Sequence, residues 1–307
     1  MGERDRGYRR LFSHPEMVKD LLTGFVHEEW VGELDLATLE RQNGSYVADD
    51  LREREDDSVW RVRFRDRWLY VYVLLEFQSA VDRFMAVRMM TYIGLLYQDL
   101  AQRKELVDGR LPPVVPIVLH AGDEAWSAAT EVAQLVCEAP FGLDRWTPRV
   151  PYLLLEERKL AASLDPSVRN LASALFRLEH DRGTRATMEL VVALEAWLSA
   201  PEQAELRRAF EAMLARVLKA GAPPETPPRL EETRAMLETK MAQWEREWQE
   251  RSEAHGRAAL LARLLERKFG ALDESVRARV MGADPEQLLR YADRVLEAPD
   301  LEAVFAD

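Results

Sequence analysis

The sequence predicts an α/β protein that continues into a helical C-terminal region. Three observations support this prediction: two strand-like runs at Ser58–Phe64 and Trp68–Phe77, a helical repeat over Phe84–Gln102, and an apolar run at Val114–Leu119. The two strand-like runs are rich in Val, Trp, Tyr and Phe, which are typical of strands. The apolar residues of 84–102 recur at helical spacing. A short, continuous apolar run suits a buried strand, so a purely helical protein does not explain the pattern.

Helices are predicted for most of the flanking sequence. Asp5–Phe25 is predicted as a helix or a helix pair, because its apolar residues recur at helical spacing and Pro15 suits the first position of a new helix. Asn170–His180 and Ala186–Leu218 are further predicted helices. A short strand is expected near Tyr152–Leu155.

The sequence also predicts where the chain divides. The stretch 221–228, Gly-Ala-Pro-Pro-Glu-Thr-Pro-Pro, is the clearest linker, and a highly charged helix is expected over Leu230–Arg251. We therefore expect a core domain with a helical extension over 1–220, a linker and connector helix over 221–256, and a small helical domain over 257–307.

Composition excludes several kinds of protein and site. The single cysteine, Cys137, excludes an internal disulfide and a cysteine-cluster metal site. No apolar run reaches the ~20 residues that span a membrane, and no signal-peptide segment follows the charged N-terminus, so the expected location is the cytoplasm. The formal net charge of −12 argues against a broadly basic nucleic-acid binder. Any contact with phosphate must be local.

The predicted hairpin brings two carboxylates together. A turn centred on Asp66 and Arg67 pairs Asp57 with Glu76, and directly opposed residues share a face with Cβ atoms ~4.5–5.5 Å apart. Gln78 lies two residues beyond Glu76 and points the same way. A one-residue slip would put the carboxylates on the other face. That other face is apolar and predicts a core, with Trp60, Val62, Phe64, Val71, Val73, Leu75 and Phe77.

Two arginines share the face of the predicted carboxylates. In the same register Arg61 lies opposite Tyr72, and Arg63 lies opposite Tyr70. These guanidinium groups either contact phosphates or pack on the tyrosine rings at an exposed sheet face. Histidines show no metal-binding spacing and are predicted to be structural or exposed: His14, His27, His120, His180 and His255.

Several short segments in order over residues 5–126 carry a family resemblance. They are Asp5-Arg-Gly-Tyr-Arg-Arg-Leu-Phe-Ser-His-Pro-Glu, Asp57-Ser-Val-Trp-Arg-Val, Leu75-Glu-Phe-Gln-Ser, Met85-Ala-Val-Arg-Met-Met-Thr-Tyr and Pro116-Ile-Val-Leu-His-Ala-Gly with Trp126. The set resembles the Rpn (recombination-promoting nuclease/putative transposase) family of the PD-(D/E)XK nuclease superfamily. The segment from Leu261 to Phe305 resembles the DUF4351-type domain. The resemblance implies a restriction-endonuclease-like mixed sheet flanked by helices.

The resemblance also implies the parts of an active site. Asp57 matches the first acid of the motif, Glu76 the second acid, and Gln78 the position of the lysine. The two acids and the Phe77 carbonyl are the implied ligands of Mg²⁺, with Mn²⁺ or Ca²⁺ as alternatives, since these cations prefer oxygen. Gln78 can hydrogen-bond a water but carries no positive charge, so electrostatic stabilisation is expected to be weaker.

Supporting residues are expected on two predicted helices. Asp5 and Tyr8 occupy a motif-like position on the first helix, where they either brace the site or approach the metal. Arg88 and Tyr92 are one helical turn apart and are predicted to form a polar brace against the sheet. His120-Ala-Gly stands where the family frequently has Tyr-Asn-Gly, and no chemistry is assigned to that difference.

The function implied is a metal-dependent DNA endonuclease of the recombination-promoting, transposase-like type, which hydrolyses phosphodiester bonds. A homo-oligomer, such as a dimer, is expected because cutting both strands usually needs two sites. The alternative is a catalytically weak or inactive DNA-binding or oligomeric assembly protein that retains the nuclease fold. The net charge of −12 favours this alternative, and the intact set of Asp57, Glu76 and Gln78 opposes it.

Overall fold

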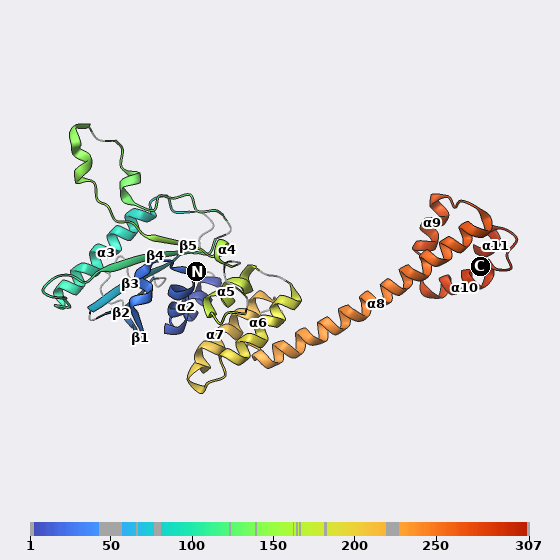
Figure 1. The fold of residues 1–307 in the computed structure, drawn as a ribbon, viewed down its shortest axis with the longest axis horizontal. Coiled ribbons are helices and arrows are strands. Elements are labelled where there is room, and N and C mark those ends of the chain that lie inside the picture. The colour runs from blue at the N-terminus through green and yellow to red at the C-terminus, as the bar shows by residue number, and fades with distance from the viewer. Residues whose placement is uncertain are drawn as a thin grey trace. The chain divides into compact units, whose positions relative to one another are not determined.

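The computed structural model describes residues 3–42, 57–65, 67–76, 81–122, 124–138, 140–161, 163, 165, 167–180, 183–218 and 227–305. The chain divides into two compact units, Met1–Arg234 and Ala235–Asp307. The first unit combines a sheet with helices, and the second is helical (Figure 1). The predicted fold class, a mixed sheet flanked by helices and followed by a helical region, is confirmed.

A five-stranded mixed sheet forms the centre of the first unit. Its order follows the sequence, and the first three strands are antiparallel while the third, fourth and fifth run parallel. The sequence pattern does not assign the first strand. The strands are β1 (Leu34–Gln42), β2 (Asp57–Phe64), β3 (Arg67–Glu76), β4 (Val114–His120) and β5 (Leu153–Glu156).

The β2–β3 hairpin has a different register from the predicted one. Asp57 pairs with Leu74 instead of Glu76, because Phe64 pairs with Arg67 and the whole register follows from that pair. Arg65 takes a left-handed backbone conformation with φ 56° to make this turn. The pairing is shifted by two residues, and an even shift keeps the faces. Asp57 and Glu76 therefore still occupy one face, as diagonal neighbours.

The same shift changes the partners of the two arginines. Arg61 pairs with Tyr70, and Arg63 pairs with Trp68, so the predicted partners Tyr72 and Tyr70 are wrong. The turn lacks the Asn-Gly or Asp-Gly dipeptide that normally marks a two-residue hairpin loop. Without that mark, the position of the turn depends on packing of the strands.

Helix α3 (Met85–Gln102) covers the face that carries Asp57 and Glu76 by register. Its buried residues, among them Met89 and Leu96, pack with Val59 of β2 and Val118 of β4. The predicted core face is also buried, since Trp60, Val62, Val71, Ile117 and Leu119 are all 1% exposed or less. Both faces of the sheet are therefore covered.

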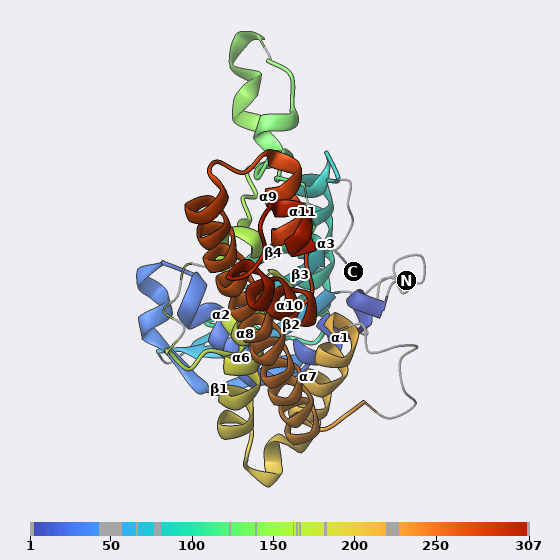
Figure 2. The same ribbon diagram turned by 90° about the vertical axis from the view of Figure 1, so that its right-hand side faces the viewer.

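A helical layer lies on the side of the sheet opposite α3, as the positions of α2 and α3 show in two views (Figures 1 and 2). Pro15 opens α2, as the sequence predicts. The stretch predicted as helical over 186–218 is divided by η5 (Pro201–Gln203), because proline lacks the N–H that a helix interior needs. The helices here are α1 (Glu3–Leu11), α2 (Pro15–Phe25), α5 (Leu171–His180), α6 (Thr184–Trp197) and α7 (Ala204–Val217).

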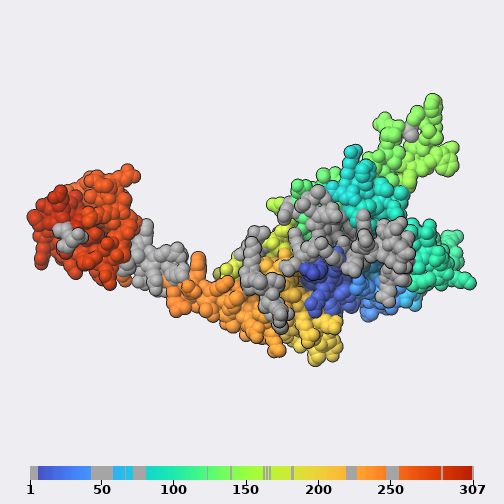
Figure 3. Space-filling view, turned by 180° about the vertical axis from the view of Figure 1, so that it is seen from behind, coloured from blue at the N-terminus to red at the C-terminus, as the bar shows by residue number. Residues whose placement is uncertain are grey.

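An arm of residues 131–151 projects from the first unit (Figure 3). An isolated bridge between Glu131 and Pro151 closes its base. The arm holds two short helices, η3 (Val132–Leu135) and η4 (Pro140–Trp146), and Phe141 of η4 is fully exposed. The remaining short elements are η1 (Glu29–Glu33) and α4 (Glu157–Leu160).

The second unit is built on the C-terminal part of α8 (Leu230–Phe269). The expected helix over 230–251 continues without a break through Gly256, because buried residues beyond it, such as Leu261 and Leu265, hold the helix against its neighbours. A glycine in a helix interior costs only about 1 kcal/mol. The neighbours are α9 (Glu274–Met281), α10 (Pro285–Val295) and α11 (Leu301–Phe305). Among the described residues, no helix combines the length and apolarity needed to span a bilayer.

Candidate active site

The parallel strands place three polar residues side by side where they end. Glu76 of β3 pairs in register with His120 of β4, and His120 pairs with Glu156 of β5. Register neighbours occupy the same face, and it is the face of α3, because Val118 lies two residues before His120 and packs with α3. Asp57 is on that face too. The carboxyl ends of parallel strands are the usual place for a binding site in an α/β sheet.

The predicted catalytic set is only partly within the described residues. The backbones of Asp57 and Glu76 lie at the first position of β2 and the last position of β3. Their side chains, the side chain of Asp5, and all of Phe77 and Gln78 lie outside what the structure describes. The ligand set predicted from the sequence therefore stays a prediction.

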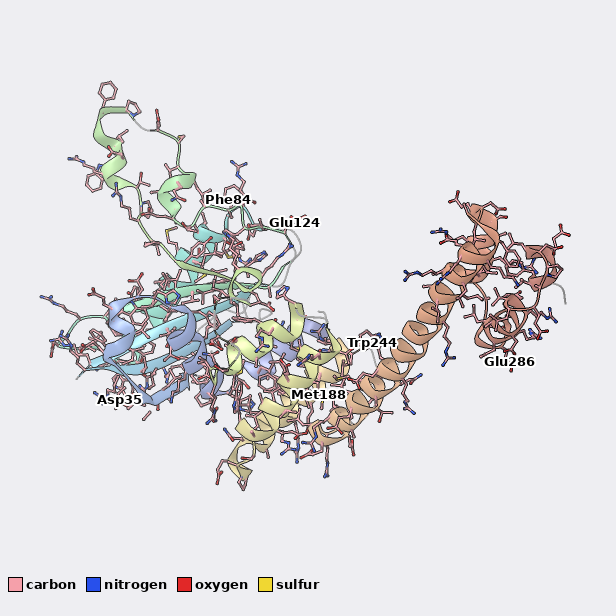
Figure 4. All side chains as sticks on the ribbon, turned by 45° about the vertical axis from the view of Figure 1, so that its right-hand side comes forward. Asp35, Phe84, Glu124, Met188, Trp244 and Glu286 are labelled. Atoms are coloured by element: carbon pink, nitrogen blue, oxygen red, sulfur yellow. The ribbon has the colours of Figure 1, made fainter. Side chains whose placement is uncertain are left out.

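His120 is buried at the carboxyl end of β4, with 2% of its surface exposed. Its Nε2 lies 2.9 Å from the carbonyl oxygen of Glu124, which follows β4. Glu124 is labelled in Figure 4. A carbonyl only accepts, so Nε2 carries the proton. The other ring nitrogen, Nδ1, is buried and has no hydrogen-bond partner among the described residues. With Nε2 donating, the acceptor nitrogen of the neutral ring is Nδ1.

A pocket of about 350 Å³ adjoins this histidine. Glu156 borders it and is held from two sides: Oε2 accepts the backbone N–H of Trp126 at 3.3 Å, and Oε1 pairs with Lys159. The Trp126 ring packs edge-on against the His120 ring with centroids 5.0 Å apart. The pocket combines charges of both signs. It is lined by His120, Gly122, Glu124, Ala125, Glu156, Arg158 and Lys159.

Helix α3 begins at the same end of the sheet. The β3–α3–β4 crossover joins parallel strands, so α3 runs back across the sheet from the end of β3. Asp82 accepts the backbone N–H of Phe84 at 2.9 Å and pairs with Arg88 at 3.2 Å. Burial raises the pKa of Tyr152 to about 12, and the charge of Asp82 acts in the same direction. Tyr92 is buried between α3 and the sheet.

Tyr8 connects the first helix to the end of β5. Its side chain is fully buried, and its hydroxyl donates to Glu157 Oε1 at 2.6 Å. His180 Nε2 lies 3.4 Å from the same oxygen. Because Glu157 directly follows the last residue of β5, Tyr8 holds α1 against the segment that leads away from Glu156.

The two arginines of β2 lie toward the hairpin turn. The guanidinium carbons of Arg61 and Arg63 are 4.5 and 4.3 Å from the ring centroid of Trp68. Arg61 also pairs with Glu40, and with Glu105 at 3.4 Å. Packing on an aromatic ring is thus one of the two predicted roles, but the ring belongs to Trp68. These cations already have partners within the fold.

Sequence reasoning missed the residues around the pocket. His120 is predicted to be structural or exposed, and Glu124, Glu156 and Lys159 are not singled out. The available signal was position: a polar residue directly after a buried apolar run stands at the end of a strand. Within the described side chains, no group of three or more His, Cys, Asp or Glu is arranged to hold a metal ion.

Known proteins similar to this chain share one family. The family model described as "Putative transposase, YhgA-like" matches residues 3–199. Recombination-promoting nuclease RpnC of Escherichia coli (strain K12) is 28% identical over 168 residues, which are 51% of this chain and 55% of RpnC. RpnA of the same strain is 30% identical over 123 residues, covering 39% of this chain and 40% of RpnA.

One shorter relative is matched over most of its length. The "Putative inactive recombination-promoting nuclease-like protein YjiP" of Escherichia coli (strain K12) is 31% identical over 88 residues, covering 29% of this chain and 85% of YjiP. The chain spans about half the length of the curated nucleases it matches. No solved structure matches it. The Rpn resemblance is confirmed, and the chain belongs to the YhgA-like transposase family that includes the recombination-promoting nucleases.

Proposed function

We propose that this chain is a divalent-metal-dependent DNA endonuclease that hydrolyses phosphodiester bonds. The observation that carries the proposal is the meeting of Asp57, Glu76, His120 and Glu156 on one face at the carboxyl end of the parallel strands. The relatives named as recombination-promoting nucleases support the same activity.

The donor set at this end of the sheet suits a divalent cation. Asp57 and Glu76 are diagonal neighbours by register, which would leave two like charges together without a compensating cation. Their carboxylates, with the Phe77 carbonyl, would hold Mg²⁺, or Mn²⁺ or Ca²⁺ in its place, since these ions take oxygen ligands. Such an ion, when bound, stabilises charge on the phosphate and lowers the pKa of a bound water.

The roles of the other residues follow from their chemistry. Gln78 would orient a water by hydrogen bonding, and because it is neutral it adds no charge stabilisation. The hairpin arginines are engaged with Trp68, Glu40 and Glu105. DNA binding would therefore depend strongly on the cation. A dimer of the chain would cut both strands.

Plasmid cleavage tests the proposal directly. The full chain is incubated with supercoiled plasmid and Mg²⁺, Mn²⁺ or Ca²⁺, alongside Glu76→Gln and the matched control Glu105→Gln, which removes a carboxylate near the hairpin turn. We expect Glu76→Gln to lose roughly 100-fold or more in rate, the scale for losing a main electrostatic contribution. Glu105→Gln should keep its rate per folded molecule. Cleavage unaffected by both Asp57→Ala and Glu76→Ala would refute the site.

A second candidate function is DNA binding without cleavage. It is favoured by the relative named as inactive and by the neutral residue at position 78. This candidate predicts DNA binding that weakens steeply with salt, with no product in any metal. Cleavage that depends on Glu76 would exclude it.

A further inference from the structure

The starting observation is the unused nitrogen of His120. The side chain is 2% exposed, and Nδ1 has no hydrogen-bond partner among the described residues. A buried polar atom left without a hydrogen-bond partner destabilises the folded state. The simplest alternative is a structural histidine anchored only by its bond to Glu124. That alternative explains Nε2 but gives no reason for the buried lone pair on Nδ1.

The hydrogen bond at Nε2 prepares Nδ1 for a metal ion. Because Nε2 donates to the Glu124 carbonyl, the neutral ring presents a lone pair at Nδ1. Histidines that bind metals almost always donate their other N–H to a carbonyl, a carboxylate or a water, which fixes the ring. The Trp126 ring lies edge-on against the imidazole, and Glu156 holds the Trp126 backbone. The ring is thus held by groups other than the metal.

The position of His120 is also suitable. It is the register neighbour of Glu76 on an adjacent parallel strand, on the same face. Adjacent strands are ~4.8 Å apart, close enough for their residues to share one ion. Glu156, on the far side of His120, is engaged with Lys159 and the Trp126 N–H. It therefore serves as a support for the histidine.

We propose that Nδ1 of His120 is a further ligand of the divalent metal at Asp57 and Glu76, and that it makes the site favour Mn²⁺ over Mg²⁺. Mg²⁺ is best matched by an all-oxygen set, whereas an imidazole nitrogen raises affinity for transition metals more. This inference rests on the proposed function, because it needs a metal at the two carboxylates.

Binding of Mn²⁺ to the full chain, without DNA, tests the inference. Pulsed electron paramagnetic resonance of bound Mn²⁺ detects a coordinated imidazole by its ¹⁴N coupling. We expect this coupling in the wild type, and a change to the ¹⁵N pattern when histidine is labelled with ¹⁵N. His120→Asn should remove the coupling and weaken Mn²⁺ about tenfold or more, with a smaller change for Mg²⁺. His27 is exposed, and His27→Asn is the matched control. It should keep both the histidine coupling and the wild-type affinity for Mn²⁺.

The outcomes separate this inference from the proposed function. Mn²⁺ that binds in a Glu76-dependent way without histidine coupling, or with a coupling that survives His120→Asn, overturns the inference and leaves the nuclease proposal intact. A wild-type chain that binds no Mn²⁺ overturns both. The ¹⁵N-labelled wild type needs no substitution, so an unfolded His120→Asn variant would not prevent a decision on histidine ligation.

Discussion

The two ends of the β2–β3 hairpin differ in how their polar groups are satisfied. At the turn, Arg61 and Arg63 lie against Trp68, and Arg65 pairs with Glu33 at 3.0 Å. At the other end, Nδ1 of His120 has no partner among the described residues. A pocket of about 350 Å³ is lined by His120, Glu124 and Glu156, among others.

This difference separates groups that stabilise the fold from groups suited to chemistry. Polar groups with partners contribute to stability, whereas an unsatisfied buried atom in a native protein calls for an explanation such as a ligand or a catalytic role. The hairpin is rich in arginine near its turn, but the features expected of an active site are at its opposite end. Changes at the turn should therefore affect stability, and changes at the carboxyl end should affect metal binding and cleavage.

The largest loss of folding stability is expected from a substitution in the core that supports both ends of the hairpin. Trp60 is 1% exposed on the face opposite α3, and its Nε1 donates to Ser58 Oγ at 3.2 Å. Trp60→Ala should lower the free energy of unfolding by about 3–5 kcal/mol, measured by urea denaturation, and should weaken Mn²⁺ binding through unfolding. Trp60→Phe should lose much less. A folded Trp60→Ala variant of normal stability would show that the ends do not depend on this core.

Two tyrosines, one near each end, are predicted to give an alkaline loss of stability. Burial raises the pKa of Tyr70 to about 12, with a further rise from its bond to Glu105, and burial raises the pKa of Tyr152 to about 12. A raised pKa in the folded state gives stability that is present below the ordinary value of 10 and is lost as pH rises through about 12. The free energy of unfolding should therefore fall between pH 10 and 12.

Variants that each remove one tyrosine hydroxyl show how much of the alkaline loss of stability comes from each tyrosine. Tyr70→Phe and Tyr152→Phe should each reduce the slope of stability against pH, measured by urea denaturation from pH 9 to 12. Glu105→Gln should lower the pKa of Tyr70 and leave that of Tyr152 unchanged, as followed by phenolate absorbance. Equal shifts of both tyrosines in Glu105→Gln would contradict the separation of the two ends.

The smallest change in folding stability is expected from loss of an exposed ion pair at the hairpin turn. Arg65 and Glu33 have side chains 66% and 50% exposed, and exposed pairs contribute at most about 1 kcal/mol. Arg65→Ala should change the free energy of unfolding by about 0.5 kcal/mol or less and leave plasmid cleavage unchanged. A clear loss of cleavage with unchanged stability would assign a DNA contact to the turn end.

Local patterns predicted most of the fold. The helix predicted over 84–102 is observed from Met85 to Gln102, and the strand predicted from Val114 extends one residue further, to His120. These elements carry clear periodicity or a continuous apolar run, and Pro15 marks the start of α2. The hairpin register was wrong by two residues because the turn at Arg65 has no glycine or asparagine to mark it.

The site was predicted less completely because it depends on neighbours that are distant in sequence. Counting residues outward from the hairpin turn is enough to predict that Asp57 and Glu76 share a face, because both belong to one hairpin. His120 and Glu156 join them only through the parallel register of β3, β4 and β5, and periodicity within a strand does not reveal which strand lies beside it. Likewise, the hydrogen bond that fixes the His120 ring comes from the backbone of Glu124, which carries no sequence signature.

The parallel order of the strands also has a consequence for the timing of synthesis. A nascent chain that has just completed β3 holds Asp57 and Glu76, but β4 and β5 are still to come. His120 joins the sheet only after β4 has been made, and Glu156 only after β5 has been made. The hydroxyl of Tyr8 gains its partner only once Glu157 has been made. A chain that ends before β5 therefore cannot bring Asp57, Glu76, His120 and Glu156 to one face of the sheet.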